Sequence, residues 1–189
     1  MNVPAVAEAQ TRALAVAEPE ATPPAVAATE VRIAAARVPE ISAFGVPVSE
    51  VIADAADGER SIVAFLCREC AYSAADAAGN ARTSLPPTIR TIMVPCTGRV
   101  SPLHLLAALA EGADGVYVAG CLEGQCHYRV GNFHALDRVA FVRRLLESVG
   151  VEPERAAMFT MSAADTPRFV ATARGMDATI SRLPRLPRS

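Results

Sequence analysis

The chain has 189 residues, of which 51% are apolar, and its formal net charge is −2. This length and composition allow one globular domain with a packed core, and the charge gives no sign of a nucleic-acid-binding surface. No run of about 18 apolar residues occurs, so we predict no membrane span. Glu8, Arg12, Glu18 and Pro19 interrupt the first residues, which argues against a secretory signal and predicts a cytoplasmic location.

The first 60 residues differ in composition from the rest of the chain. Residues 1–30 contain ten alanines, four prolines and no glycine or aromatic residue. Because such a segment buries little apolar surface, we expect a disordered or partly helical Ala/Pro-rich arm. Residues 31–60 are expected to form a linker, in which a short helix runs from Ser49 to a stop at Gly58.

Alternating strands and helices are predicted from Ser61 onward. The continuous apolar run SIVAFLC (61–67) is typical of a strand buried on both faces. A helix is expected over residues 71–82, and TIRTIMVPC (88–96) gives a second strand. The next helix covers residues 102–112, where Ser101 is the expected N-cap and Gly112 the stop.

The second half of the domain repeats the alternation. GVYVAGC (115–121) is a third strand, and AAMFTMS (156–162) is a weaker fourth strand. A long helix is expected between them, from Asn132 as its cap to Ser148, with Gly150 past its end. Its apolar stripe should contain Leu136, Val139, Leu146 and Val149.

A last helix follows the fourth strand. Ser162 and Asp165 resemble a capping box at its start, and Pro184 must end it. Four alternations with short connections predict an α/β domain at 61–182, with a four-stranded, mainly parallel sheet and helices on both faces. Right-handed crossovers favour the flavodoxin-like strand order 2-1-3-4. Residues 183–189 are expected to be a flexible basic tail.

Five cysteines fall within a window of 60 residues, and each lies at or just after the end of a predicted strand. Cys67 and Cys70 follow the first strand, Cys96 the second, and Cys121 and Cys126 the third. The carboxyl ends of parallel strands meet at one edge of the sheet, where open α/β sheets bind ligands. We therefore expect the five thiols to converge there.

Convergent thiols are compatible with several kinds of site. An iron–sulfur cluster needs four thiolates, and a structural zinc ion needs four thiolates or three with His127. A catalytic dithiol at Cys67 and Cys70, or buried cysteines acting as small apolar residues, are further readings. The cluster is favoured because a dithiol does not need three more cysteines and a domain with an ample core does not need zinc. Arg99 and His127 are expected beside the cluster, where they tune it without binding iron.

Five ordered segments carry a family resemblance: FLCRECAYSAADAAGNAR, VPCTGRVSP, GADGVYVAGC, GQCHYRVGN and GVEPER. Together they resemble the iron–sulfur delta subunit of methyl-viologen-reducing hydrogenase, which is associated with heterodisulfide reductase. The resemblance implies a [2Fe-2S] cluster bound by four of the cysteines Cys67, Cys70, Cys96, Cys121 and Cys126. It covers about residues 61–180.

The resemblance also implies a function and partners. The expected function is electron transfer between a heterodisulfide-reductase-like flavoprotein and a hydrogenase-type or formate-dehydrogenase-type subunit, with catalysis on the partners. Arg99 and residues 122–130 form the expected docking rim. The alternative is a zinc-stabilised assembly module without a redox role.

Overall fold

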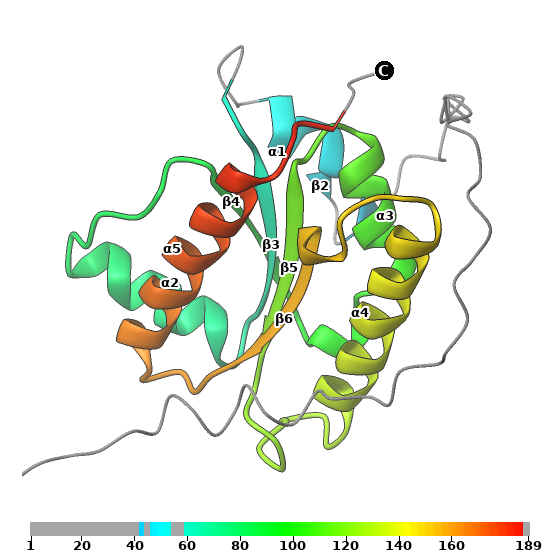
Figure 1. Ribbon diagram of the computed structural model, residues 1–189. Coiled ribbons are helices and arrows are strands. Elements are labelled where there is room, and N and C mark those ends of the chain that lie inside the picture. Colours follow the sequence, from blue (N-terminus) through cyan, green and yellow to red (C-terminus); the bar gives the residue numbers. More distant parts are fainter. Residues whose placement is uncertain (1–41, 44–45, 54–58, 187–189) are drawn as a thin grey trace, which may run out of the picture. The chain divides into compact units, whose positions relative to one another are not determined.

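A computed structural model describes residues 42–43, 46–53 and 59–186. Four of the strands in these ranges form one sheet: β3 (Ile62–Cys67), β4 (Ile89–Val94), β5 (Gly115–Gly120) and β6 (Ala156–Thr160). Their order is β4-β3-β5-β6 and each neighbouring pair is parallel, as Figure 1 shows. This arrangement confirms the predicted α/β class and the flavodoxin-like order 2-1-3-4.

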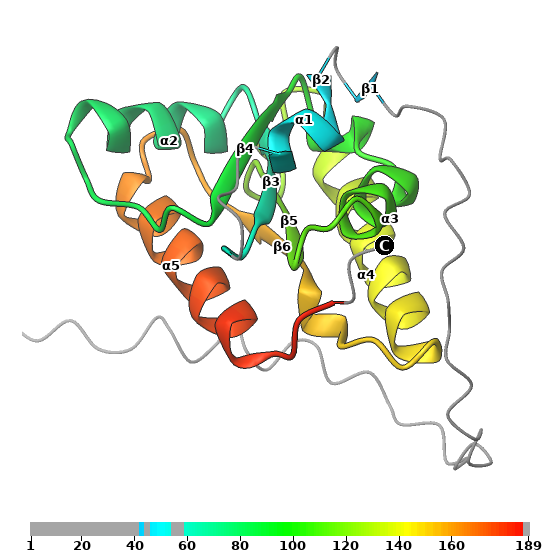
Figure 2. The ribbon, with the colours of Figure 1, turned by 90° about the horizontal axis from the view of Figure 1, so that it is seen from above.

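Helices cover both faces of the sheet (Figures 1 and 2). One layer contains α2 (Ala71–Asn80) and α5 (Thr166–Arg182), and the other contains α3 (Pro102–Ala110) and α4 (Gly131–Ser148). Two short 3-10 turns, η1 (Thr97–Arg99) and η2 (Pro153–Arg155), complete the connections. Among the described residues, none of the helices has both the length and the apolar character that crossing a membrane requires.

The two-residue period of the strands produces two apolar cores. In β3, Val63 and Phe65 pack into the α3/α4 layer, while Ile62, Ala64 and Leu66 pack into the α2/α5 layer. Every residue of β3 and β5 is buried, because both strands are interior and have helices on each side. This explains why their sequences are continuously apolar rather than alternating.

Most of the predicted helix ends are confirmed. The N-cap of α3 is Ser101, whose backbone N–H donates a hydrogen bond to Nδ1 of His104 at 2.9 Å. Gly112 and Gly150, which follow α3 and α4, have φ values of +110° and +76°. These left-handed conformations end helices and are costly for residues other than glycine.

Three details of the helices correct the predictions. The N-cap of α5 is Asp165 rather than Ser162, since Oδ1 of Asp165 accepts the N–H of Arg168 at 3.3 Å. The N-cap of α4 is Val130, so Asn132 lies inside the helix. Leu136 and Val149 are 43% and 51% exposed; the buried side of α4 contains Ala135, Val139, Val142 and Leu146. That set has the i, i+4, i+7 and i+11 spacing of one helix face.

A short segment before the main domain adds one helix and one hairpin. The predicted helix is observed as α1 (Val48–Ala53), and its Val51 and Ile52 pack against the α3/α4 core. Strands β1 (Ser42–Ala43) and β2 (Val46–Pro47) pair antiparallel before it. The hairpin was not predicted, because two residues per strand are too few to show an alternating pattern. The predicted stop at Gly58 and the Ala/Pro-rich arm at 1–30 lie outside the described residues.

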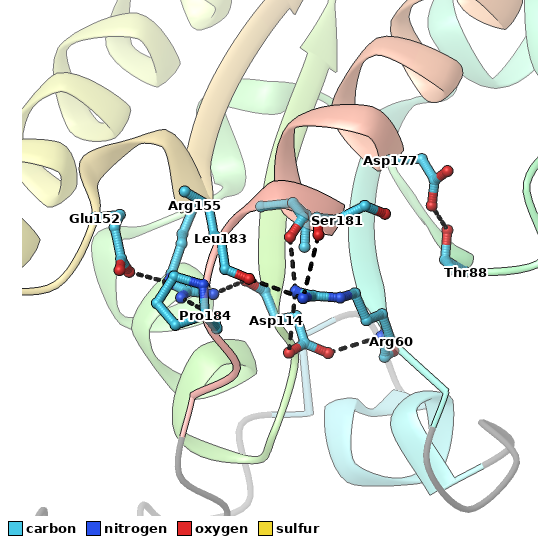
Figure 3. A network of polar contacts seen from close by, with 11 residues as sticks. Arg60, Thr88, Asp114, Glu152, Arg155, Asp177, Ser181, Leu183 and Pro184 are labelled. Atoms are coloured by element: carbon cyan, nitrogen blue, oxygen red, sulfur yellow. Dashed lines mark hydrogen bonds and ion pairs between the residues drawn. The ribbon is translucent and has the colours of Figure 1, made fainter.

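Arginine side chains occupy the amino edge of the sheet, as Figure 3 shows. Arg155 is fully buried, pairs with Glu152 at 2.8 Å, and donates hydrogen bonds to the carbonyl oxygens of Asp114 and Pro184. Arg60 donates to the carbonyl oxygens of Ile180 at 2.6 Å and Leu183 at 2.8 Å. These contacts attach the end of α5 and the chain that follows it to the starts of the strands.

Candidate metal centre

The carboxyl edge of the same sheet carries the cysteines. Cys67 ends β3, Cys70 is the N-cap of α2, and Cys96 is the N-cap of η1 just after β4. Cys121 directly follows β5, and Cys126 lies in the loop before α4. All five are free thiols, all are buried, and all belong to the core cluster on the α2/α5 side. The topology thus brings side chains from three strand ends into one place.

The sulfur atoms fall into a group of three and a pair. The Sγ atoms of Cys67, Cys70 and Cys121 lie within 4.8 Å of one another, and the Cys67–Cys121 distance is 3.9 Å. The Sγ atoms of Cys96 and Cys126 are also 3.9 Å apart. Two sulfurs bound about 2.3 Å from one tetrahedral metal atom are roughly 3.8 Å apart. Both short distances therefore match two thiolates that share a metal atom.

Hydrogen bonds within the group of three shift the pKa values of its thiols in different directions. The pKa of Cys67 is lowered to about 6, first because Cys70 donates a hydrogen bond to it and also because backbone N–H groups of Glu69 and Thr97 face it. Burial opposes this shift. The same hydrogen bond, together with burial, raises the pKa of Cys70. For Cys121, burial is the largest cause and the pKa is raised.

Backbone N–H groups also face the Cys96–Cys126 pair. Burial raises the pKa of Cys96 to about 11, although the N–H of Gly98 donates to its sulfur at 3.4 Å. Burial also acts to raise the pKa of Cys126, but the N–H groups of Asn132, Tyr128 and Gly131 together lower it. Two of these donors belong to the first turn of α4, where N–H groups have no partner within the helix.

The donor set fits a soft metal or a metal–sulfur cluster. The grouped ligand atoms are thiol sulfurs without a carboxylate among them, and thiolates select zinc, copper(I) and iron–sulfur clusters rather than magnesium or calcium. N–H groups directed at sulfur are the contacts that stabilise bound thiolates and tune iron–sulfur clusters. Five thiols in two adjacent groups are enough for a site with four ligands.

Asn132 has a role that the sequence did not reveal. It is 3% exposed, and its Nδ2 donates to the carbonyl oxygens of Cys121 at 3.2 Å and Leu122 at 3.0 Å. Its side chain therefore ties the start of α4 to the segment that leaves β5. A polar residue after glycine at a helix start is typical of a cap, so the local sequence favoured the wrong interpretation.

The structure places Arg99 and His127 at the surface of this edge. Arg99 is exposed, and its backbone N–H donates to the carbonyl oxygen of Cys96 at 2.9 Å. The ring of His127 is exposed and lies edge-on to the ring of Tyr128, with centroids 5.1 Å apart. The backbone N–H of His127, rather than its ring, acts on the pKa of Cys121. The tuning roles of the two side chains stay predictions.

Fold and site together define a flavodoxin-like α/β domain with five buried cysteines, a candidate metal centre, at the carboxyl edge of its sheet. The sequence profile of the family "Methyl-viologen-reducing hydrogenase, delta subunit" matches residues 62–184, which span all of this domain's strands and helices from β3 onward. The chain belongs to this family, as its sequence segments predicted.

Individual relatives agree with the family match. The chain is 45% identical over 125 residues to the iron-sulfur subunit of the F420-non-reducing hydrogenase of Archaeoglobus profundus, and the alignment covers 66% of this chain and 91% of the relative. It is 47% identical over 118 residues to the vhu iron-sulfur subunit of the corresponding hydrogenase of Methanopyrus kandleri, covering 62% and 89%. A subunit of the ferredoxin:CoB-CoM heterodisulfide reductase of Methanosarcina mazei is 43% identical over 108 residues, covering 57% of this chain and 14% of the relative.

Proposed function

We propose that this chain carries a [2Fe-2S] cluster and transfers electrons within a larger complex. The observation that supports the cluster type is the presence of two sulfur pairs, each 3.9 Å apart. A [2Fe-2S] cluster binds two cysteine sulfurs on each iron, whereas a [4Fe-4S] cluster binds one on each and needs more widely separated sulfurs. When bound, the cluster supplies one-electron redox chemistry. The relatives named as iron-sulfur subunits support the same cofactor.

We assign the iron ligands to the two short pairs. Cys96 and Cys126 hold one iron, and Cys67 and Cys121 hold the other. Cys70 is then the fifth cysteine, buried beside Cys67 and Cys121. The chain's own contribution is to bury the sulfurs, to direct backbone N–H groups at them, and to keep them at an edge that a partner can approach.

The proposed partners are the subunits that give and receive the electrons. We propose a hydrogenase-type or formate-dehydrogenase-type donor and a heterodisulfide-reductase-like flavoprotein acceptor, with catalysis on these partners. The names of the relatives support a hydrogenase and a heterodisulfide reductase. The docking rim is formed by Arg99 and residues 122–130, where Tyr128 and Val130 are exposed next to the thiols. We propose a cytoplasmic location, because disulfides are rare there and none of the five cysteines is paired in a disulfide in the structure.

Metal analysis of the protein purified without oxygen tests the cluster. We expect a brown protein with visible absorbance and about two irons and two sulfides per chain. A colourless protein that contains one zinc ion would contradict the electron-transfer proposal. It would instead support a zinc-stabilised assembly module, a function that the group of three thiols around Cys67 could serve.

Serine substitution of each cysteine tests the ligand assignment. Cys67→Ser, Cys96→Ser, Cys121→Ser and Cys126→Ser should each lose the cluster. Cys70→Ser is the matched control and should keep a full complement of iron and sulfide. Iron-replete protein in two or more of the five variants would refute the assignment, whereas loss in Cys70→Ser with retention in one other variant would move the fifth position to that residue.

A further inference from the structure

Two glycines meet where the Cys96–Cys126 pair is formed. Gly98 lies in η1 and Gly131 is the first residue of α4. Neither has a positive φ, so neither backbone conformation requires glycine. A Cβ atom on Gly131 would lie 2.3 Å from Sγ of Cys96 and 3.4 Å from Sγ of Cys126. Ordinary contacts between such atoms are about 3.5–4.0 Å, so a methyl group would displace the Cys96 sulfur by roughly 1 Å or more.

Gly98 makes the reciprocal contact through backbone atoms. A Cβ on Gly98 would lie 2.7 Å from Cα of Gly131 and 3.2 Å from its carbonyl oxygen. Backbone atoms cannot move away by changing a rotamer, so a side chain at this position would separate η1 from α4. The N–H of Gly98 also donates to Sγ of Cys96 at 3.4 Å. A side chain at either glycine would therefore disturb the region in which the two sulfurs of the pair lie.

Arg138 forms hydrogen bonds across this contact between the two glycines. It lies seven residues after Gly131, about two helical turns away on the same face of α4. Its Nη1 atom donates to the carbonyl oxygens of Gly98 at 2.6 Å and Val100 at 3.0 Å. One side chain of α4 therefore bonds to the backbone of both Gly98 and Val100, which links this segment to the helix that begins after Cys126.

We propose that Gly98 and Gly131 are positioning residues that set the geometry of the Cys96–Cys126 pair, and that Arg138 keeps them in contact. The inference rests on the proposed function in one respect, because the pair is taken to hold one iron. The other pair is positioned differently: Cys67 is the last residue of β3 and Cys121 directly follows the neighbouring β5, so the spacing of the sheet already places them. Only one half of the site depends on the glycine contact.

The variant Gly131→Ala tests the proposal in the intact chain purified without oxygen. We expect loss of most of the iron and sulfide, and any remaining cluster should show a changed electron paramagnetic resonance spectrum and reduction potential. Gly79→Ala in α2 and Gly175→Ala in α5 are matched controls, since a Cβ at either position meets nothing within 4 Å. Both controls should keep the cluster and unfold at or slightly above the wild-type temperature.

A second measurement does not depend on the cluster. After removal of metal with a chelator, the rate of iodoacetamide labelling at each cysteine is followed by mass spectrometry. In Gly131→Ala, labelling of Cys96 and Cys126 should become faster, while labelling of Cys67 and Cys121 stays at the wild-type rate. Equal acceleration at all five cysteines would mean that the variant merely unfolds the domain, and would overturn the positioning role.

Arg138 provides an independent variant that adds no atoms at the contact. Arg138→Met removes both hydrogen bonds but keeps the apolar stem, and we expect partial cluster loss and faster labelling of Cys96. Arg138→Lys retains one donor group, so it should keep more of the cluster than Arg138→Met and show slower labelling of Cys96. Wild-type iron content, spectrum and labelling in Gly131→Ala and Arg138→Met would overturn the inference. Wild-type protein without iron would instead refute the proposed function, while the labelling pattern would still test the positioning.

Discussion

At the carboxyl edge of the sheet, backbone N–H groups face buried sulfur atoms; at the amino edge, arginine side chains face backbone carbonyl oxygens. Cysteines follow three strands at the first edge, after β3, β4 and β5. Polar residues precede all four strands at the second edge: Arg60, Thr88, Asp114 and Arg155. At one end of the strands backbone N–H groups interact with thiols, and at the other end backbone carbonyl oxygens interact with arginines.

This difference separates stability from chemistry. The charged groups of the amino edge have partners within the protein, as the contacts of Arg155 and Arg60 with Glu152 and several carbonyls show. At the carboxyl edge the thiols contact mainly one another and backbone N–H groups, so their ligand capacity is available for a metal. Substitutions at the amino edge should change only the free energy of unfolding, whereas substitutions at the carboxyl edge should also change the metal centre.

The largest effect on stability is expected for Arg155→Met. It removes a fully buried guanidinium that pairs with Glu152 and donates to the carbonyl oxygens of Asp114 and Pro184. We expect a loss of about 3 kcal/mol in the free energy of unfolding, measured by chemical denaturation. Iron per folded chain should not change. Cluster loss at full stability would contradict the separation of the two edges.

The next largest loss in the free energy of unfolding is expected for Asn132→Ala, a substitution at the carboxyl edge. It removes two hydrogen bonds to the buried carbonyl oxygens of Cys121 and Leu122, with an expected cost of about 2 kcal/mol. Because the segment after β5 loosens, iron should also be lost faster to a chelator. Asn80→Ala is the matched control, since Asn80 is exposed and its side chain donates to the carboxylate of Asp76 at 3.3 Å rather than to a backbone carbonyl. Equal chelation rates in the two variants would exclude a role for Asn132 at the centre.

Arg60→Met should have a smaller effect, because the Arg60 side chain is 19% exposed. It removes the donors to the carbonyl oxygens of Ile180 and Leu183 at the end of α5. We expect a loss of about 1.5 kcal/mol and faster amide hydrogen exchange in the last turn of that helix. Arg174→Met is the control, since its hydrogen bond to the carbonyl oxygen of Ser84 is exposed. A similar loss in both variants would argue against the attachment of α5 by Arg60.

The smallest effect concerns the helix cap of α5. Asp165→Ala should cost about 1 kcal/mol, because the side chain accepts the N–H of Arg168 at 3.3 Å. Ser162→Ala should leave the unfolding temperature unchanged. Both residues follow β6, the strand of the sheet that no cysteine follows, so neither change should alter the iron content. A larger loss of stability in Ser162→Ala than in Asp165→Ala would support the predicted capping box instead.

The features predicted correctly from the sequence depend on periodicity and on residues with restricted backbones. Continuous apolar runs identified β3 and β5, and Ser101, Gly112 and Gly150 marked helix ends that the structure confirms. The hairpin of β1 and β2 escaped prediction because its strands are too short for a pattern. The apolar stripe of α4 was half right: Val139 and Leu146 are buried, but Leu136 is exposed and the adjacent Ala135 is buried instead, a choice that only packing decides.

The candidate site shows the same limit. Parallel topology alone predicted that thiols after three strands converge at one edge. The division into a group of three and a pair depends on side-chain distances that spacing does not encode. Gly131 gave no local signal either, because its need for glycine comes from the sulfur of Cys96, which lies 35 residues away in the sequence.

The amino-edge arginines also hold the two ends of this domain close together. Arg60 stands just before the first strand of the sheet and donates to the carbonyl oxygen of Leu183, so the incoming and outgoing chain are adjacent. Neighbouring segments can be joined at both points without crossing the thiol edge, which lies at the other end of the strands. In the Methanosarcina mazei relative the alignment covers 14% of the protein, so the matching region is one part of a longer chain there.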